Sequence, residues 1–96
     1  MATISSDILA SYAADAAREV DGVRGLVEST LHRHQGVRVL EDNGQVRLEL
    51  HLAIEWGASI PAVGRDVQER VAEYLQRMAS IEIEAVDVVI DEIGRL

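Results

Sequence analysis

The side chains with the clearest chemical potential in this sequence are three histidines. His32 and His34 are two positions apart, and on a strand they would project from the same face, where two imidazoles could chelate a metal ion. Arg33 lies between them and would repel a cation, and His51 belongs to a different segment of the chain. A zinc site needs three or four converging ligands, and nothing in this spacing makes three histidines converge. We therefore expect surface histidines and no metal or other cofactor, and a metal-dependent activity of these residues is kept as a hypothesis to test.

Carboxylates near His51 offer a second kind of chemistry. Glu49 and Glu55 share the polar side of one predicted strand with His51 and Arg47. A carboxylate pair used for acid–base catalysis needs a pocket and a shifted pKa, and an open sheet face supplies neither. The chain has no cysteine, and its glycines and serines form no phosphate-binding loop or nucleophile elbow. The sequence predicts a protein that is not an enzyme and has no small-molecule substrate.

Acidic residues outnumber basic ones in this chain of 96 residues. It has 17 Asp and Glu against 9 basic residues, all of them Arg, which gives a formal net charge of −8. Without a basic cluster, neither nucleic-acid binding nor direct docking on anionic lipid is expected. No signal peptide is visible, and the longest uncharged run, 57–64, is too short for membrane insertion. We expect a soluble cytoplasmic protein whose uncompensated acid concentrates near the C-terminus, at Glu82, Glu84, Asp87, Asp91 and Glu92.

Hydrophobic periodicity sets the elements that position these side chains. Apolar residues alternate with polar ones over 46–56, which predicts a long strand with one buried and one polar face. Asn43-Gly44 precedes it and is typical of a two-residue hairpin turn. The register that follows puts both apolar sets on one face, and it pairs Asp42 with Gln45, Val39 with Leu48, and Val37 with Leu50.

Two amphipathic helices are expected around these strands. The first covers 5–21, with Ser5 as its N-cap and Gly22 as its left-handed C-terminal residue. Its five alanines make it thin, so that it can lie close to a sheet. The second begins near Pro61 and ends at about Ala79. Its outer face is expected to be solvated and to carry the ion pairs Asp66–Arg70 and Glu73–Arg77.

Shorter strands complete the predicted fold. The phase of the apolar pattern slips between Ile83 and Val86, which indicates a bulge or a late strand start. The third and last strands are joined through a helix, so as neighbours they would be parallel. The economical solution is one domain, 1–96, with an α+β fold: a two-layer sandwich of a small mixed β-sheet with two α-helices packed on one face. The remaining strands are expected at 23–28, 37–41 and 86–91, and a loop at 29–35.

The outer face of this sheet has no helix over it in such a sandwich. Its mixed charges suit self-complementary contacts with a second copy or with a partner. Sheet edges offer a second route to assembly. The candidate interaction residues on the open sheet face are Arg47, Glu49, His51, Glu55, Asp87 and Val89.

Residues 55–63 (EWGASIPAV), followed by Val67-Gln68 and Val71, resemble the signature of the alkaline shock protein family, also called the bacterial envelope stress response family. Its members have a strand that ends in an aromatic-Gly pair, then Ile-Pro, then a helix with this Val-Gln spacing. Three further pieces match in order: 19–26 (EVDGVRGL), 36–39 (GVRV) and 81–88 (IEIEAVDV). No one piece is specific, but the ordered set covers nearly the whole chain.

The resemblance implies a cytoplasmic bacterial protein concerned with cell-envelope homeostasis. Some members self-associate, and some are held at the membrane by a separate membrane-anchored partner; the family carries no agreed catalytic residues. The chain departs from the pattern in lacking Lys and tails and in its histidine-bearing loop. The expected function is a structural or scaffold module that self-associates and binds a membrane-anchored partner, peripheral at the cell membrane through that partner. The alternative is a cytoplasmic regulatory adaptor that binds a soluble enzyme or protein complex.

Overall fold

The chain folds into two helices and four strands in the order α-β-β-β-α-β, an α+β fold as the sequence predicts. The computed structural model describes residues 5–28 and 34–94. In chain order its elements are α1 (Ser6–Arg18), β1 (Val23–Leu26), β2 (Val37–Asp42), β3 (Gln45–Glu55), α2 (Ile60–Ala79) and β4 (Ile83–Gly94).

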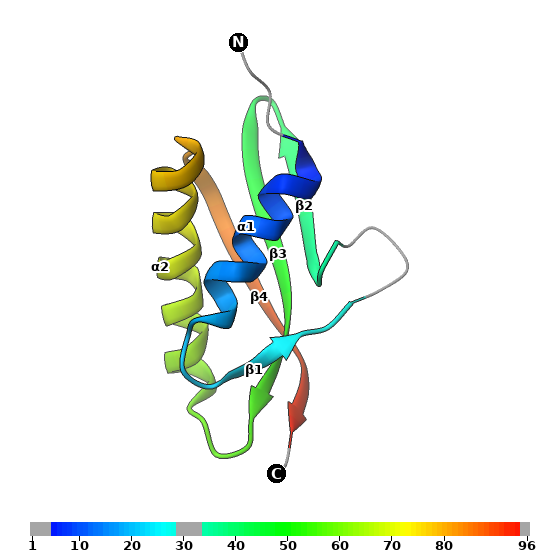
Figure 1. The fold of residues 1–96 in the computed structure, drawn as a ribbon, viewed down its shortest axis with the longest axis vertical. Helices are drawn as coiled ribbons and strands as arrows, with labels where there is room; N and C mark the ends of the chain where they lie inside the picture. Colours follow the sequence, from blue (N-terminus) through cyan, green and yellow to red (C-terminus); the bar gives the residue numbers. More distant parts are fainter. Residues whose placement is uncertain (1–4, 29–33, 95–96) are drawn as a thin grey trace.

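The long strand β3 is the centre of the sheet. Along one edge its first half pairs with β2 and its second half with β1, both antiparallel. Along the other edge β4 runs parallel to β3 over nearly its whole length. The sheet twists strongly, so that β4 passes behind β3 between the top and the bottom of Figure 1. The expected mixed sheet, with a parallel pair joined through a helix, is confirmed.

The hairpin between β2 and β3 has the expected turn. Asn43 and Gly44 both have positive φ, 52° and 80°, as a two-residue hairpin loop of this type requires. The predicted register is confirmed at each pair: Asp42 with Gln45, Val39 with Leu48, and Val37 with Leu50.

Both helices pack on the same face of the sheet (Figure 1). On α1 the buried residues are Leu9 and the five alanines, and on α2 they are Val63, Val67, Val71 and Leu75. Because alanine is small, α1 lies close to the sheet, as expected. The helices also meet through Tyr12 and Tyr74, whose rings pack edge to face with centroids 6.0 Å apart. These contacts build one continuous core between the two layers.

The helix starts are capped by serines. The Ser5 side chain accepts a hydrogen bond from the Ile8 backbone N–H at 3.2 Å, which confirms the predicted N-cap. Ser59 does the same for Ala62 at the start of α2, at 3.4 Å.

The first helix is shorter than predicted. It ends at Arg18 rather than at residue 21, and its C-cap Glu19 keeps right-handed helical angles. Gly22 has φ +95°, but it lies in the turn that leads into β1. A Cβ there would lie 2.6 Å from Val63, so the glycine serves a close approach to α2 rather than a helix end. The apolar pattern carries through Val20 because that side chain is buried beyond the helix.

The last strand is longer than predicted, Ile83–Gly94 rather than 86–91. The register shifts between the pairs Val46–Ile83 and Arg47–Ala85, which confirms the expected bulge. A second shift, near the end of the strand, was not expected. β1 ends at Leu26, and of the predicted loop 29–35 only His34 and Gln35 lie within the described residues.

Three side chains differ from the sequence-based expectation. Trp56 lies beyond the end of β3 and is 63% exposed, not on the buried face. Arg70 donates to Glu19, the C-cap of α1, at 2.9 Å, and the Arg77 guanidinium lies 5.8 Å from the centre of the Tyr74 ring. The ion pairs found in the described part of the chain therefore do not include Asp66–Arg70 or Glu73–Arg77; contacts with α1 and with an aromatic ring replace them.

Candidate functional site

The predicted interaction residues lie on the sheet face opposite the helices. In the pairing of β3 with β4, Glu49 stands beside Asp87, and His51 stands beside Val89. Paired residues of neighbouring strands project to the same side, and every second residue of β3 shares that side. Arg47 and Glu55 therefore belong to the same face.

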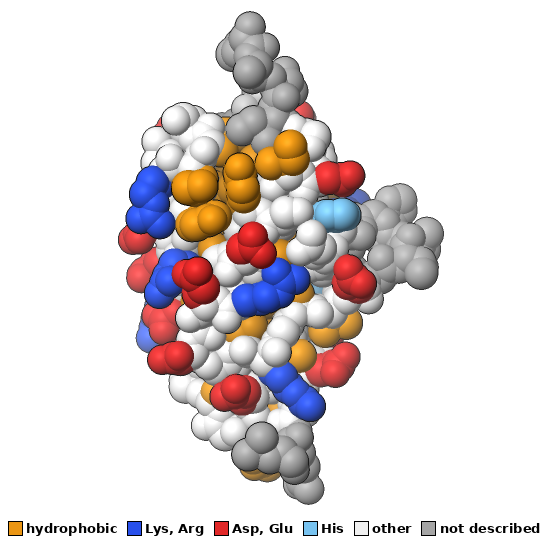
Figure 2. Space-filling model, in the orientation of Figure 1, with side chains coloured by type: hydrophobic (Ala, Val, Ile, Leu, Met, Phe, Trp, Pro, Cys, Tyr) orange, Lys and Arg blue, Asp and Glu red, His pale blue; other side chains and the backbone are white. Residues whose placement is uncertain are grey.

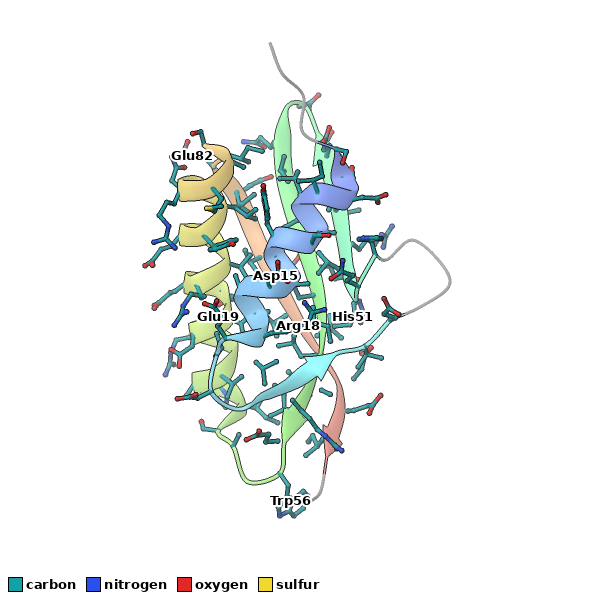
Figure 3. All side chains as sticks on the ribbon, in the orientation of Figure 1. Asp15, Arg18, Glu19, His51, Trp56 and Glu82 are labelled. Carbon is teal, nitrogen blue, oxygen red and sulfur yellow. The ribbon has the colours of Figure 1, made fainter. Side chains whose placement is uncertain are left out.

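His51 lies where β2 gives way to β1 along the edge of β3. Its backbone N–H donates to the Gly36 carbonyl at 3.0 Å, and its own carbonyl accepts from the Val27 N–H at 2.8 Å. Two strand ends are thereby tied to one residue. Figure 3 shows His51 beside the central strand at the level where β1 crosses it. Both backbone groups of His51 are thus hydrogen-bonded, which fixes the backbone that carries the imidazole.

The imidazole of His51 bridges two carboxylates. Nε2 lies 2.7 Å from Glu49 Oε1, and Nδ1 lies 3.0 Å from Asp91 Oδ2. The His51 side chain is only 14% exposed. A neutral imidazole can donate from one nitrogen only, whereas the protonated ring donates from both. The arrangement therefore sets one ring nitrogen of His51 against each of the two carboxylates.

Arg47 and Asp87 form a neighbouring ion pair. Their side chains meet at 3.2 Å and are 47% and 48% exposed. Exposed pairs of this kind contribute about 0–1 kcal/mol to stability. Their charges remain open to contact from outside, so they are better suited to recognition than to holding the sheet.

We refer to Arg47, Glu49, His51, Asp87 and Asp91 as the outer-face cluster. The sequence placed four of these residues on one face but counted Asp91 as uncompensated acid. The structure corrects this expectation, because Asp91 contacts His51 and Asp87 contacts Arg47. The second irregularity of β4 falls between Ile90 and Glu92, so simple alternation could not show where Asp91 would point.

The other two predicted residues extend this face. Val89 is half-buried beside His51. Glu55 is exposed at the end of β3 and forms no ion pair with a basic residue of the described segments. The structure thus brings five polar side chains together and places Val89 and Glu55 at their border.

The two described histidines, His34 and His51, do not gather into a metal site. Within residues 5–28 and 34–94, no three His, Cys, Asp or Glu side chains are arranged to hold a metal ion. His34 forms an isolated β-bridge with Val37 and contacts Gln35, whereas His51 pairs with Glu49 and Asp91. His32 falls outside the described residues.

Two apolar surfaces were not expected from the sequence. Figure 2 shows hydrophobic side chains gathered between the N-terminal end of α1 and the C-terminal end of α2; Ile8 and Met78 on these segments are each about half exposed. At the opposite end of the molecule, an open hollow of about 310 Å³ lies beside Trp56, Ile60 and Ile93. Trp56 is labelled at that end in Figure 3. Exposed apolar side chains grouped in this way are typical of contact surfaces.

The described helices give no membrane span. Neither α1 nor α2 is long and apolar enough to cross a bilayer.

Comparison with protein families gives one match over almost the whole chain. The alkaline shock protein family, described by a cell envelope-related function, matches residues 1–95. An uncharacterized protein of Bacillus subtilis (strain 168), YqhY, is 32% identical over 96 aligned residues, which cover 88% of this chain and 70% of that protein.

Solved structures show the same fold at low sequence identity. A doubly substituted MamM CTD superposes with a TM-score of 0.68 at 16% identity, covering 93% of this chain and 84% of the other. A MamM CTD variant in a manganese form gives 0.60 at 16% identity, over 92% of this chain and 99% of the other. A variant in a zinc form gives 0.61 at 16% identity, over 94% and 87%. The two-layer arrangement is therefore one that other proteins also adopt.

Proposed function

The chain belongs to the alkaline shock protein family, whose function is related to the cell envelope, and we propose that it is a non-enzymatic interaction module of the envelope. It acts as a scaffold by self-association and by binding a membrane-anchored partner. The single observation that carries this proposal is the outer-face cluster, a set of oriented charges on a sheet face that neither described helix covers.

Self-association through this face suits its mixed charge. In a two-fold contact the same patch faces itself, so a patch needs both acid and base to complement its own copy. The outer-face cluster has Arg47 and His51 beside Glu49, Asp87 and Asp91. Because the charges are held by internal bonds, little side-chain entropy is lost when a second copy docks.

The position at the membrane is proposed to come from a partner. The net charge of −8 disfavours direct contact with anionic lipid. A membrane-anchored protein that presents basic residues on the cytoplasmic side, where Lys and Arg are concentrated, would attract this acidic chain. The proposal therefore assigns the protein to the cytoplasm, peripheral at the cell membrane through this partner.

Light scattering of the purified protein over a concentration series tests the self-association. We expect the mass to rise with concentration, and Arg47→Glu to keep the protein monomeric, because it turns the exposed cation of the cluster into a like charge beside Asp87. Arg65→Glu changes the net charge equally on the exposed side of α2 and should leave the association intact. A wild-type protein that stays monomeric at every concentration contradicts the proposal.

Fractionation of native cells tests the role of the partner. We expect the protein to co-sediment with membranes and to move to the soluble fraction when its partner is removed by detergent. A protein that is never found with membranes and co-purifies with one soluble enzyme would instead support the regulatory adaptor.

A further inference from the structure

The edge of β4 that faces away from β3 is unpaired in the described part of the molecule. β4 contributes 12 residues to the sheet and pairs only with β3 among the strands described. The other edge of β3 is occupied by β2 and β1, which form the opposite side of the sheet. An open strand edge is a template on which another strand can pair.

The backbone groups on this edge can be assigned. The Gln68 side chain of α2 donates to the Val86 carbonyl at 2.9 Å, so the backbone of Val86 points away from β3. The pairing with β3 is regular from Ala85 to Ile90, and successive residues of a strand point their backbone groups to opposite sides. Val88 and Ile90 therefore also present their N–H and C=O groups to the free edge. Their side chains are half-buried.

Both flanks of this edge have a defined chemistry. Side chains on the helix side include Val88 and Ile90, which are apolar. The outer side carries the acids Asp87, Asp91 and Glu92, and no basic residue occurs anywhere from 81 to 94. Arg47 of β3 forms an ion pair with Asp87, and the His51 ring contacts Asp91. Exposed Glu84 and Glu92 have no ion pair with any basic side chain that the structure describes.

A second copy of this chain does not suit the edge. Pairing β4 with β4 would set the acids of one copy against those of the other, and like charges across strands are destabilising. A strand with basic side chains would instead be attracted to these acids across the same pairing.

We propose that an extended segment of a partner protein adds to the free edge of β4 as a further strand. Its alternate residues are apolar toward the helices and Lys or Arg toward the outer face. The ladder starts at Val88, because Gln68 already occupies the Val86 carbonyl. This inference rests on the proposed function, which identifies the partner as a membrane-anchored protein. The inference adds the sequence pattern that the binding segment of this partner must have.

Binding of a synthetic peptide to the full chain tests the proposal. The probe is a fluorescent peptide of about eight residues, the length of an ordinary strand, that alternates Val and Lys, and its matched control alternates Val and Glu. We expect the Val-Lys peptide to bind at least about tenfold more tightly, because charge complementarity selects partners. Equal binding of the two peptides, or no binding of either, overturns the proposal.

Hydrogen exchange locates the peptide. The amides of Val88 and Ile90, which face the free edge, should exchange more slowly with the peptide bound. Those of Asp87 and Val89, which face β3, should not change. Protection at the hollow beside Trp56 or at residues of β2 instead would place the peptide elsewhere and overturn the assignment.

Two kinds of variant distinguish peptide binding at the β4 edge from binding elsewhere on the surface. Val88→Pro removes an N–H that faces outward and keeps the ladder with β3. It should lower the affinity for the peptide by about tenfold or more, because the first hydrogen bond between β4 and the peptide is lost. Should this variant fail to fold, the double variant Glu84→Lys with Glu92→Lys tests the charge of the edge alone, against Glu69→Lys with Glu73→Lys on α2 as the matched control. Peptide affinity that is the same in the edge and control variants contradicts the proposal.

These outcomes are independent of the self-association test. A chain that self-associates but does not bind the Val-Lys peptide sinks the edge proposal alone. A monomeric chain that binds the peptide at Val88 and Ile90 sinks only the outer-face assembly.

Discussion

The two faces of β3 are built from alternate residues of one strand, yet different forces fix them. On the helix side, Leu48, Leu50 and Leu52 are fully buried at 0% exposure. On the other side, Arg47 and His51 are held by carboxylates from β3 and β4. The inner face stabilises the fold through apolar burial, which is insensitive to direction. The outer face contributes little stability and a defined pattern of charge, which is what recognition needs.

The largest difference between the faces should appear when a core leucine is truncated. Leu50→Ala removes a fully buried side chain between the sheet and the helices, and it should lower the free energy of unfolding by about 2–5 kcal/mol. Urea denaturation measures the loss. On the outer face, Arg47→Ala should change stability by less than about 1 kcal/mol, since its ion pair is exposed. Similar losses in both variants would contradict the division between the faces.

The next effect concerns the close packing of α1. Ala14→Leu places a larger side chain where exposure is 0%, and overpacking of this kind costs about 1–3 kcal/mol. Thermal unfolding measures the cost. Ala62→Leu, at the half-exposed start of α2, is the control and should be near neutral. A stable Ala14→Leu variant would mean that α1 does not need its alanines for approach to the sheet.

The smallest expected effect concerns the partly buried histidine. His51→Gln keeps a donor but cannot reach both Glu49 and Asp91 at once, so one carboxylate loses its bond. The carboxylates are each 27% exposed and water reaches them, so we expect a loss of about 1 kcal/mol. His34→Gln, on an exposed residue, is the control. An unchanged stability in His51→Gln would show that the bridge contributes nothing to the fold.

Sequence patterns predicted the inner face better than the outer face. The alternation over 46–56 and the Asn43-Gly44 turn determined the β2–β3 register, because a one-residue slip would have exposed every leucine. The Ser5 cap of α1 reflects local chemistry that the sequence shows directly, whereas the Ser59 cap of α2 was not predicted. The end of α1 at Arg18 could not be predicted from the sequence, because the apolar pattern continues to Val20 although the helix does not.

The candidate site was only partly visible in the sequence. Alternation placed Arg47, Glu49 and His51 on one face and the parallel strand brought Asp87 beside them. The direction of the Asp91 side chain could not be predicted in this way, because it depends on the second irregularity of β4 and so on how that strand fits against β3. The exposure of Trp56 likewise depends on where β3 ends, and alternation alone extended the strand by one residue too many.

The central claim is that copies of this chain meet through the outer sheet face. The chain has no cysteine, so Val89→Cys introduces one thiol beside the outer-face cluster, and Glu69→Cys introduces one on exposed α2. The measurement is the rate of maleimide labelling of each variant as the protein concentration rises. Burial of the outer face between copies predicts that labelling at position 89 slows with concentration while labelling at position 69 stays constant. Concentration-independent rates at both positions, in a protein that light scattering shows to be associated, would contradict the claim.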